Sequence, residues 1–525
     1  MRELYAKIQY RRAALVLTAV LLSVQATANR SLAESSATQQ WPESSSLKTT
    51  LDVLASRENA RRDRTIFLRL GQHTINFWFD LDYGRIDVRY DAGVWTTVWI
   101  GWGKKEHPFK ITPPFSTIGH HRLEVRWRPY QAQSIPLPHS YHVWVLPPAD
   151  RMFEHTDGHT MVLWKGGDKS LDKPLFVVEG IDPKDTRDPA TESYPVRYYA
   201  GGIDFFRKAQ EYGADVVILN FDDGGASIID NASVVQDAVR YISQIKTGSS
   251  AIRLVGISMG GVIARYALAN AEADGNTFDV SHFVSLDSPQ QGAVLDSNLQ
   301  DYVKQELGNS DVSLRAEAAK EMLVYNAYNP NGEIHDAFYS KINQTNGNGY
   351  PKHTKNIGIA LSTDSPNTST GTWLQIRVRE PTTNIILRKI NFHKAQDDDI
   401  SQAGSYLPKT STIMRGIGKY QGIFDVVWGL KRLLDPMHIP HESVLDIVDD
   451  SSKFDITLMP SSTHHHDEIP NDIIYPLLAE LDLLLPLTIA IAGPSTLFSG
   501  TRGTWNASVG GGSNSYSYEW EYFLT

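Results

Sequence analysis

The stretch LVGISMGGVIARYALANAE, residues 254–272, runs from aliphatic residues through three glycines around one serine into alanines at helical spacing. This pattern predicts a buried strand, a sharp turn, and a helix that packs closely on a sheet. Gly256, Ser258 and Gly260 form a G-x-S-x-G spacing in the turn. At average residue usage, that spacing arises by chance roughly 0.2 times in a chain of this length. The strand and the helix around it therefore matter more than the motif itself.

Ser258 is the candidate nucleophile at this turn. A serine between a buried strand and a helix is held in a strained backbone conformation, and Gly256 and Gly260 remove side chains that would clash there. We expect its Oγ at the carboxyl ends of the strands, where the N–H of Met259, at the start of the helix, can stabilise a developing oxyanion. The alternative is a serine in a glycine-rich packing turn, and we favour the nucleophile.

The chain on both sides of this turn alternates apolar strands with helices. Strands are expected at residues 173–180, 214–221, 251–256, 280–286, 356–362 and 454–460. Strands that are apolar along their whole length are typical of a parallel sheet covered on both faces. We therefore predict an α/β domain with a doubly wound, mostly parallel sheet over residues 150–487. Residues 293–350 break the alternation and are expected to form a cap insertion.

A serine hydroxyl needs a neighbouring base to act near neutral pH. His464, His465 and His466 follow the last predicted strand, and we choose His466 because the helix at Asn471 follows it closely. Three adjacent histidines also suggest a metal site. Successive side chains diverge, however, and no second cluster at ligand spacing occurs, so no metal is expected.

The acid that orients the base is expected at a strand end. Asp287 ends the strand after the nucleophile helix, whereas Asp364 follows the next strand, and Asp397–Asp399 come later. Either of the first two can reach a histidine at the top of the sheet. We prefer Asp287 because it stands directly at a strand end. The N–H of Ile181, in the loop after strand 173–180, is the expected second oxyanion donor.

Residues 1–28 predict a secretory signal peptide. A positively charged leader precedes an apolar run too short to span a bilayer, and a small-x-small pattern ends at Ala28, where cleavage is expected. No later run reaches the roughly 18 apolar residues of a transmembrane helix. We therefore expect a secreted protein without a transmembrane segment in its mature chain.

Two segments of β character flank the α/β domain. Residues 29–60 are predicted to be a flexible spacer, and residues 61–148 contain short aromatic and β-branched runs typical of a small β-sandwich. Eight of the 12 tryptophans precede residue 165. They could form a ligand-binding platform, but we favour a role in the core of the sandwich. Residues 488–525 are expected to begin a β-module that is truncated.

Charge and cysteine content exclude several classes of function. The formal net charge is −10 and the pI is near 5.9, so the chain lacks the broad basic field that nucleic-acid binding needs. It has no cysteine, which excludes disulfides, thiol catalysis and cysteine-ligated zinc. No cofactor is expected.

Four segments resemble secreted bacterial lipases and esterases of the PGAP1-like type, within the α/β-hydrolase superfamily: GISMGGVIARYAL, VSLDSPQQGA, VVEGIDP and HHHDEIP. Gln290 stands where such lipases usually carry a histidine. The resemblance implies cleavage of carboxylic esters through an acyl-enzyme on Ser258, an ester or lipid substrate, and transient contact with a lipid surface through the cap. The flanking β-modules resemble Ig-like or PKD-like accessory domains.

Two other functions remain open at this point. An amidase, a thioesterase or a polyester depolymerase could use the same residues, because the turn fixes the chemistry and not the acyl or leaving group. The chain could also be a surface binding protein in which the hydrolase fold is only a scaffold.

Overall fold

The structure is a computed structural model. It describes residues 41–43, 50–54, 65–69, 74–78, 81–103, 109–117, 119–129, 139–146, 149–182, 205–295, 297–308, 313–363, 371–379, 386–394, 404–406, 437–448, 451–464, 466, 469–484, 488–492 and 506–510. The predicted signal peptide lies outside these residues. Within the described part, no helix combines the length and apolar character needed to cross a membrane.

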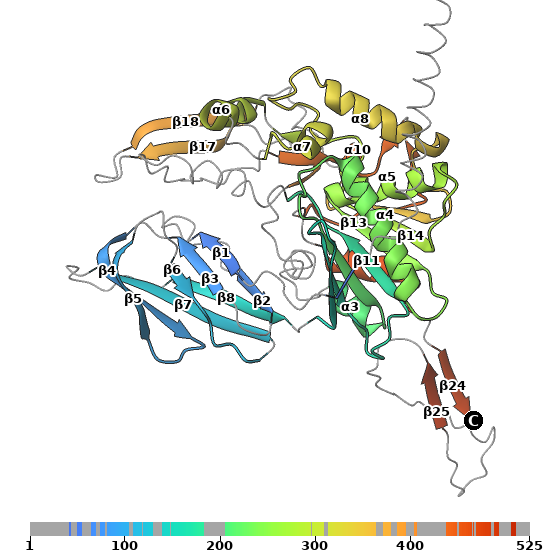
Figure 1. The fold of residues 1–525 in the computed structure, drawn as a ribbon, viewed down its shortest axis with the longest axis horizontal. Coiled ribbons are helices and arrows are strands. Elements are labelled where there is room, and N and C mark those ends of the chain that lie inside the picture. The colour runs from blue at the N-terminus through green and yellow to red at the C-terminus, as the bar shows by residue number, and fades with distance from the viewer. Residues whose placement is uncertain are drawn as a thin grey trace, which may run out of the picture.

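An eight-stranded sheet forms the centre of the larger domain (Figure 1). Its spatial order is β23-β16-β14-β13-β11-β12-β10-β9. The strands are β9 (Arg151–Glu154), β10 (Thr160–Trp164), β11 (Pro174–Val178), β12 (Asp215–Asn220), β13 (Ile252–Ile257), β14 (Val280–Leu286), β16 (Lys355–Ile359) and β23 (Ile456–Leu458). From β12 to β23 all neighbours pair in parallel, whereas β10 and β9 add an antiparallel edge. The predicted doubly wound, mostly parallel sheet is confirmed, and β9 and β10 add an edge hairpin that is not among the expected strands.

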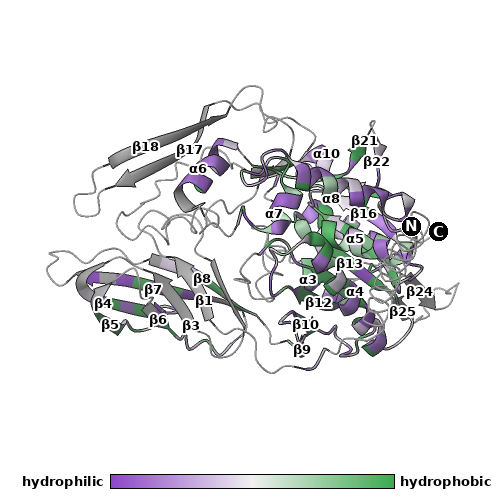
Figure 2. Cartoon of the chain, turned by 45° about the horizontal axis from the view of Figure 1, so that its top comes forward, coloured by the Kyte–Doolittle hydropathy of each residue, from purple (hydrophilic) through white to green (hydrophobic). Residues whose placement is uncertain are grey.

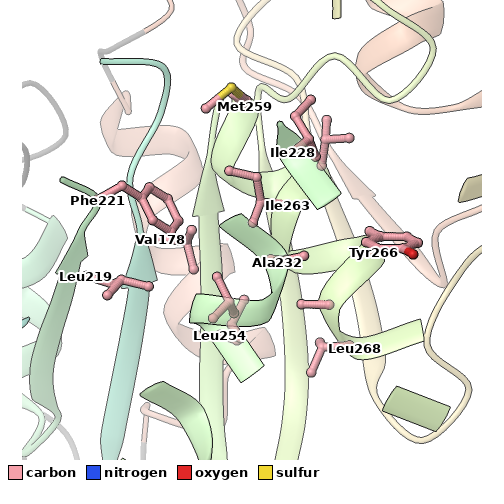
Figure 3. Packing of buried hydrophobic residues seen from close by; sticks show 14 of the residues in the cluster. Val178, Leu219, Phe221, Ile228, Ala232, Leu254, Met259, Ile263, Tyr266 and Leu268 are labelled. Atoms are coloured by element: carbon pink, nitrogen blue, oxygen red, sulfur yellow. The ribbon is translucent and has the colours of Figure 1, made fainter. Parts of the chain in front are cut away.

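Helices cover both faces of this sheet because its strands are apolar on both sides. One core lies under α4 (Ile228–Ile245) and α5 (Met259–Ala273), as Figure 3 shows for Leu254, Met259 and Ile263. The other core lies under α3 (Phe205–Glu211) and α11 (Asn471–Glu480). Alternate residues of one strand feed the two cores: Phe176 and Val178 face the first, and Leu175 and Val177 the second.

The predicted cap region, residues 293–350, is a mainly helical excursion after β14. It contains β15 (Val294–Leu295), α6 (Ser297–Leu307), α7 (Glu317–Met322), α8 (Glu333–Gln344) and the 3₁₀ turn η3 (Thr345–Gly347). A second excursion between β16 and β23 holds β17 (Gly371–Arg379), β18 (Ile386–Lys394), β19 (Gly404–Tyr406), β20 (Met437–Pro440), α10 (His441–Val444), β21 (Ile447–Val448) and β22 (Ser451–Ser452). No strand was expected between residues 362 and 454, but β17 and β18 form an antiparallel hairpin there.

The N-terminal module consists of two sheets, as expected of a sandwich. One sheet has the order β1-β3-β6, and the other β2-β8-β7-β4-β5. The strands are β1 (Thr50–Leu54), β2 (Thr65–Arg69), β3 (Thr74–Trp78), β4 (Leu81–Tyr90), β5 (Thr96–Gly103), β6 (Phe109–Ile111), β7 (Gly119–Pro129) and β8 (His139–Leu146). Figure 2 shows hydrophilic and hydrophobic residues alternating along β4 and β7. Leu123 and Val125 are accordingly buried, and Arg122 is exposed.

The prediction of a flexible spacer at residues 29–60 is wrong at two places. Glu43 forms a β-bridge with Phe153, and the Glu154 N–H donates to the Pro42 carbonyl, so residues 41–43 extend the edge of the main sheet. The physical reason is Trp41, which is buried in the core of the α/β domain. Strand β1 also lies inside the predicted spacer. At the other end, β24 (Thr488–Ala492) pairs with β25 (Asn506–Gly510) in the C-terminal strand module.

Candidate active site

Ser258 occupies the turn between β13 and α5 in a strained conformation. Its backbone angles are φ 55° and ψ −128°, a region that non-glycine residues rarely adopt and that costs about 1–3 kcal/mol. The Ser258 N–H donates to the Leu286 carbonyl at 2.9 Å, which attaches the turn to the neighbouring strand. The serine is half-buried. The fold therefore stabilises an unfavourable backbone conformation to hold this side chain in place.

The glycines around Ser258 are required by close backbone contacts. A Cβ on Gly256 would lie 2.3 Å from the Gly261 Cα, and a Cβ on Gly260 would lie 2.3 Å from the Glu179 carbonyl oxygen. A Cβ on Gly261 would lie 2.0 Å from the Ser288 Oγ. Any larger residue at these positions would push α5 away from the sheet.

The structure brings Asp287 and His466 together although 179 positions separate them in the sequence. The His466 Nδ1 lies 2.7 Å from the Asp287 Oδ2, and both side chains are buried. The other carboxylate oxygen of Asp287 accepts the Leu361 N–H at 3.0 Å. Asp287 itself has φ 47°, a second non-glycine residue with positive φ at this edge of the sheet. Both oxygens of the carboxylate are therefore engaged, and one of them orients the imidazole.

The bond to Asp287 fixes which nitrogen of His466 carries the proton. Because a carboxylate only accepts, Nδ1 must donate, and in the neutral ring Nε2 is then an acceptor. Nε2 is buried and has no hydrogen-bond partner among the described residues. A buried, unpartnered acceptor is uncommon in folded proteins. The ring is thus oriented to receive a proton on Nε2.

Of the other candidates for base and acid, His464 is among the described residues. The His464 Nε2 lies 3.1 Å from the Ser462 Oγ in an exposed part of the loop. His465, Asp364 and Asp397–Asp399 lie outside the described residues.

Strand register places Ser258 and Asp287 at the same edge of the sheet. Ile257 pairs with Leu286, and Leu286 pairs with Ile359, so the residues that follow them leave three adjacent parallel strands at one level. Adjacent strands lie about 4.8 Å apart. The serine and the carboxylate that orients His466 therefore leave neighbouring strands side by side.

The two predicted oxyanion donors lie on either side of the serine. Met259 is the first residue of α5, where backbone N–H groups have no acceptor within the helix. Ile181 follows Gly180, at which an added Cβ would lie 3.2 Å from the Ser258 Cβ. The loop after β11 therefore passes directly beside the serine.

Sequence reasoning missed Glu179, which holds that loop. It is buried, and its Oε1 accepts the Phe221 N–H from the loop after β12. A Cβ on Gly224 would lie 2.8 Å from the Asp182 N, so the two loops are also in backbone contact. No local pattern in the sequence indicates this role, because a glutamate directly after a strand is most often exposed.

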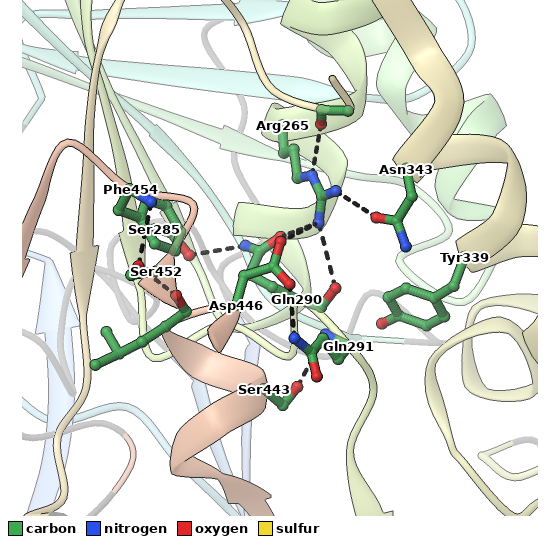
Figure 4. A network of polar contacts seen from close by, with 12 residues as sticks. Arg265, Ser285, Gln290, Gln291, Tyr339, Asn343, Ser443, Asp446, Ser452 and Phe454 are labelled. Carbon is green, nitrogen blue, oxygen red and sulfur yellow. Dashed lines mark hydrogen bonds and ion pairs between the residues drawn. The ribbon is translucent and has the colours of Figure 1, made fainter. Parts of the chain in front are cut away.

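A second missed residue is Arg265, in the middle of α5 (Figure 4). It is 1% exposed, and its guanidinium donates to the Gly349 carbonyl at 2.7 Å and to the Asn343 Oδ1 at 2.5 Å. It also donates to the Gln290 side chain at 3.2 Å and pairs with Asp446 at 3.5 Å. The buried Arg265 therefore links α5 to the cap region at residues 293–350. It also links α5 to the loop after Asp287 and to the excursion between β16 and β23. Gln290 has a structural role in this network.

Glu321 attaches the predicted cap region to the start of α4. From α7 it accepts the Ser227 hydroxyl and the Ile228 N–H, both at 2.7 Å, and so caps the N-terminus of α4. Burial raises the pKa of the Glu321 carboxyl, although both hydrogen bonds oppose that shift. Polar contacts therefore attach α7 to the start of α4.

Within the described residues, no cluster of acidic, histidine or cysteine side chains has the arrangement of a metal site.

Residues 198–336 match the family model of the PGAP1-like alpha/beta domain. None of the curated proteins shows a significant match. Among solved structures, the chain is similar to Est1E from Butyrivibrio proteoclasticus, with 14% identity, 28% of this chain and 51% of the other covered, and a TM-score of 0.19. For esterase B from Lactobacillus rhamnosis the values are 13%, 38%, 60% and 0.24, and for the carboxylesterase EstE1 from a metagenomic library 13%, 41%, 70% and 0.28.

The chain spans only 51% and 60% of the lengths of the first two of these structures. Overlaps at this identity and TM-score do not bear on activity. The family match covers the turn at Ser258 and the helix that follows it, together with β12, α4 and β14. With its mostly parallel sheet and a serine in the strand-to-helix turn, this part of the chain resembles the α/β-hydrolase superfamily.

Proposed function

We propose that this protein is a secreted serine hydrolase that cleaves carboxylic esters through an acyl-enzyme on Ser258. The observation that carries the proposal is the imidazole of His466. Its Nδ1 is bonded to the buried Asp287, and its Nε2 is left without a partner at the sheet edge where Ser258 also lies. With one nitrogen held by a carboxylate, the imidazole can use the other to accept the proton of a hydroxyl that comes within hydrogen-bond reach.

In this mechanism the His466 Nε2 takes the proton of the Ser258 hydroxyl as its Oγ attacks the ester carbonyl carbon. The resulting oxyanion accepts hydrogen bonds from the N–H groups of Met259 and Ile181. When the tetrahedral intermediate collapses, the imidazolium gives its proton to the departing alcohol. Water then gives a proton to the same nitrogen and attacks the acyl carbon. The bond from that carbon to the Ser258 Oγ breaks, the imidazolium returns the proton to Oγ, and the carboxylic acid leaves. Asp287 stays ionised and stabilises the imidazolium.

The test is hydrolysis of p-nitrophenyl esters of increasing chain length by the wild type, Ser258→Ala and His466→Ala. Because these groups act as a unit, each variant should lose on the order of 10³-fold or more in kcat. His464→Ala is the matched control, since this neighbouring histidine contacts Ser462 and not Asp287. Full activity in Ser258→Ala would refute the mechanism.

Labelling with a fluorophosphonate separates the hydrolase from a binding protein on the same scaffold. Labelling confined to Ser258, and absent in Ser258→Ala, supports the enzyme. If the wild type is not labelled and hydrolyses no ester, amide or thioester, the scaffold alternative is correct.

The proposed location rests on the leader pattern of residues 1–28. Expression of the whole chain in a secreting bacterial host should give a processed protein that begins at Asn29. Recovery of uncleaved protein in the cytoplasm would contradict secretion.

A further inference from the structure

The outer face of the five-stranded sheet in the N-terminal module carries arginines from two adjacent strands. Paired residues on antiparallel strands share a face, and the register pairs Arg85 with Arg128 and Arg89 with Glu124. The arginine face, as we name it, consists of Arg85, Arg89, Arg122, Arg126 and Arg128.

Among the described residues, two carboxylates pair with the guanidinium groups of the arginine face, and both are buried. Asp87 and Glu124 are 2% and 3% exposed. Asp87 pairs with Arg126 at 3.1 Å and with Arg128 at 2.6 Å, whereas Glu124 pairs with Arg89 and Arg122. Five guanidinium groups against two carboxylates leave three net positive charges on this face of a protein whose formal net charge is −10.

The arginines keep outward donors after these pairs are formed. The side chains of Arg85 and Arg122 are 46% and 54% exposed, so pairing with the two buried carboxylates uses only part of the hydrogen-bonding capacity of these arginines. One acidic side chain at the nearby turn, Asp91, is engaged by the His121 Nδ1 at 2.7 Å and by the Arg122 N–H. The face therefore presents donors for an external anion.

Exposed apolar side chains border the arginine face. Val94 is 87% exposed, Ile100 66% and Val98 39%, so three of the eight large exposed hydrophobic residues in the described part of the chain fall within seven positions. Trp95 lies between two of the arginines, with its ring centre 3.8 Å from the Arg126 Cζ and 4.8 Å from the Arg89 Cζ. At such exposure, the valine and isoleucine side chains leave apolar surface in contact with water, which contributes nothing to the stability of the fold.

We propose that the arginine face and the adjoining edge, residues 94–100, form a docking surface for anionic lipid. In this arrangement the guanidinium groups pair with lipid phosphates, and the Trp95 ring lies among the lipid headgroups. Val94 and Ile100 insert at the boundary between the headgroups and the acyl chains. A soluble acidic polysaccharide offers the same charges but nothing for the apolar edge, and the exposed valines and isoleucine therefore favour lipid. The surface lies in a different module from Ser258, so the proposal holds whether or not the ester hydrolase does.

The experiment is co-sedimentation of the whole chain with vesicles of phosphatidylcholine alone or with about one third phosphatidylglycerol. We expect binding to the anionic vesicles only, weakened by salt. Each arginine near such a surface contributes about fivefold in partitioning, so Arg85→Gln with Arg122→Gln should weaken binding about 25-fold. Val94→Ser should weaken it by up to about tenfold.

Arg207→Gln is the control, because Arg207 is 76% exposed on α3 and lies outside the arginine face. It should bind as the wild type does. The thermal unfolding temperature of each variant verifies that the sandwich still folds. Equal sedimentation with neutral and anionic vesicles, no loss in the double arginine variant, or binding to heparin with none to vesicles would each overturn the proposal.

Discussion

Asp287 and Asp215 are both fully buried carboxylates of the same sheet. Asp215 lies where the parallel strands begin, which we call the amino edge, and Asp287 lies where they end, which we call the carboxyl edge. Asp215 starts β12 and accepts three backbone N–H groups, from Gly166, Asp172 and Lys173, at 2.8–2.9 Å. Asp287 follows β14 and accepts one backbone N–H and one imidazole. At the amino edge, Asp215 therefore holds backbone loops in place. At the carboxyl edge, Asp287 orients the imidazole of His466. The difference separates a structural charge from a candidate catalytic one.

Positive φ angles occur at both edges, at Ser258 and Asp287 on the carboxyl edge and at Lys169 and Asp482 on the amino edge. Ser258, with ψ −128°, also lies outside the left-handed helical region that such residues usually adopt. Strain of this kind persists only where the surrounding structure enforces it, and it concentrates at functional sites.

Asp287→Asn should produce the largest effect. Asparagine retains the volume of the aspartate, but it stabilises the wrong imidazole tautomer and cannot stabilise an imidazolium. We expect a loss on the order of 10³–10⁴-fold in kcat for a p-nitrophenyl ester, with little change in unfolding temperature. A variant that keeps its activity would remove the distinction between the two edges.

Arg265→Met should follow, because it tests whether the buried network holds the carboxyl edge in place. The methionine fills the space but leaves Asp446 without its cation and several acceptors without donors. We expect the free energy of unfolding to fall by about 3–5 kcal/mol in denaturant titrations. Activity should fall as well, since the loop after Asp287 loses its contact through Gln290. Arg240→Met on α4 is the matched control, because Arg240 is half-buried and interacts with Asp237 and the Phe278 ring, outside the network of Arg265.

Asp215→Asn should reverse the pattern of Asp287→Asn. The amide nitrogen cannot accept, so N–H groups of Asp172 and Lys173 lose an acceptor, at a cost of about 1–3 kcal/mol in stability. Burial raises the pKa of Asp215, so part of this cost is offset by the removal of a buried charge. Activity per folded molecule should stay near that of the wild type. Loss of activity without loss of stability would contradict the structural role.

The sequence predicted the central strands and the turn at Ser258 well, because apolar runs and glycines report local packing directly. It did not predict the β9–β10 hairpin or the docking of Trp41, since both depend on contacts with distant chain. It narrowed the base to three histidines and the acid chiefly to Asp287 and Asp364. Only the fold pairs His466 with Asp287, across 179 positions. The catalytic roles themselves remain predictions.

Arg265 and Glu179 could not be assigned from the sequence for a related reason. An arginine in a helix and a glutamate after a strand are most often exposed. Their burial is decided by several loops that converge on each of them, and no local pattern records that convergence.

His282 gives the smallest test, as the imidazole of the amino edge to set beside His466. Its Nδ1 lies 2.9 Å from the Ser281 Oγ, and its Nε2 lies 3.8 Å from Asp482. Burial lowers the pKa of His282 from 6.5; Arg253 and Lys355 add to the shift, and Asp482 and Glu480 oppose it. A lowered pKa means that the unfolded chain binds the proton more tightly, so the stability from this group is present above pH 6.5 and is lost as the pH falls through its folded pKa.

The gap in unfolding temperature between the wild type and His282→Gln should therefore narrow as the pH is lowered from about 7.5 to about 5.5. Ester hydrolysis near neutral pH should be the same in both, because His282 lies on the edge opposite Ser258. A gap that widens on acidification would mean that the folded protein holds this imidazole charged. The amino edge would then favour an imidazolium at His282.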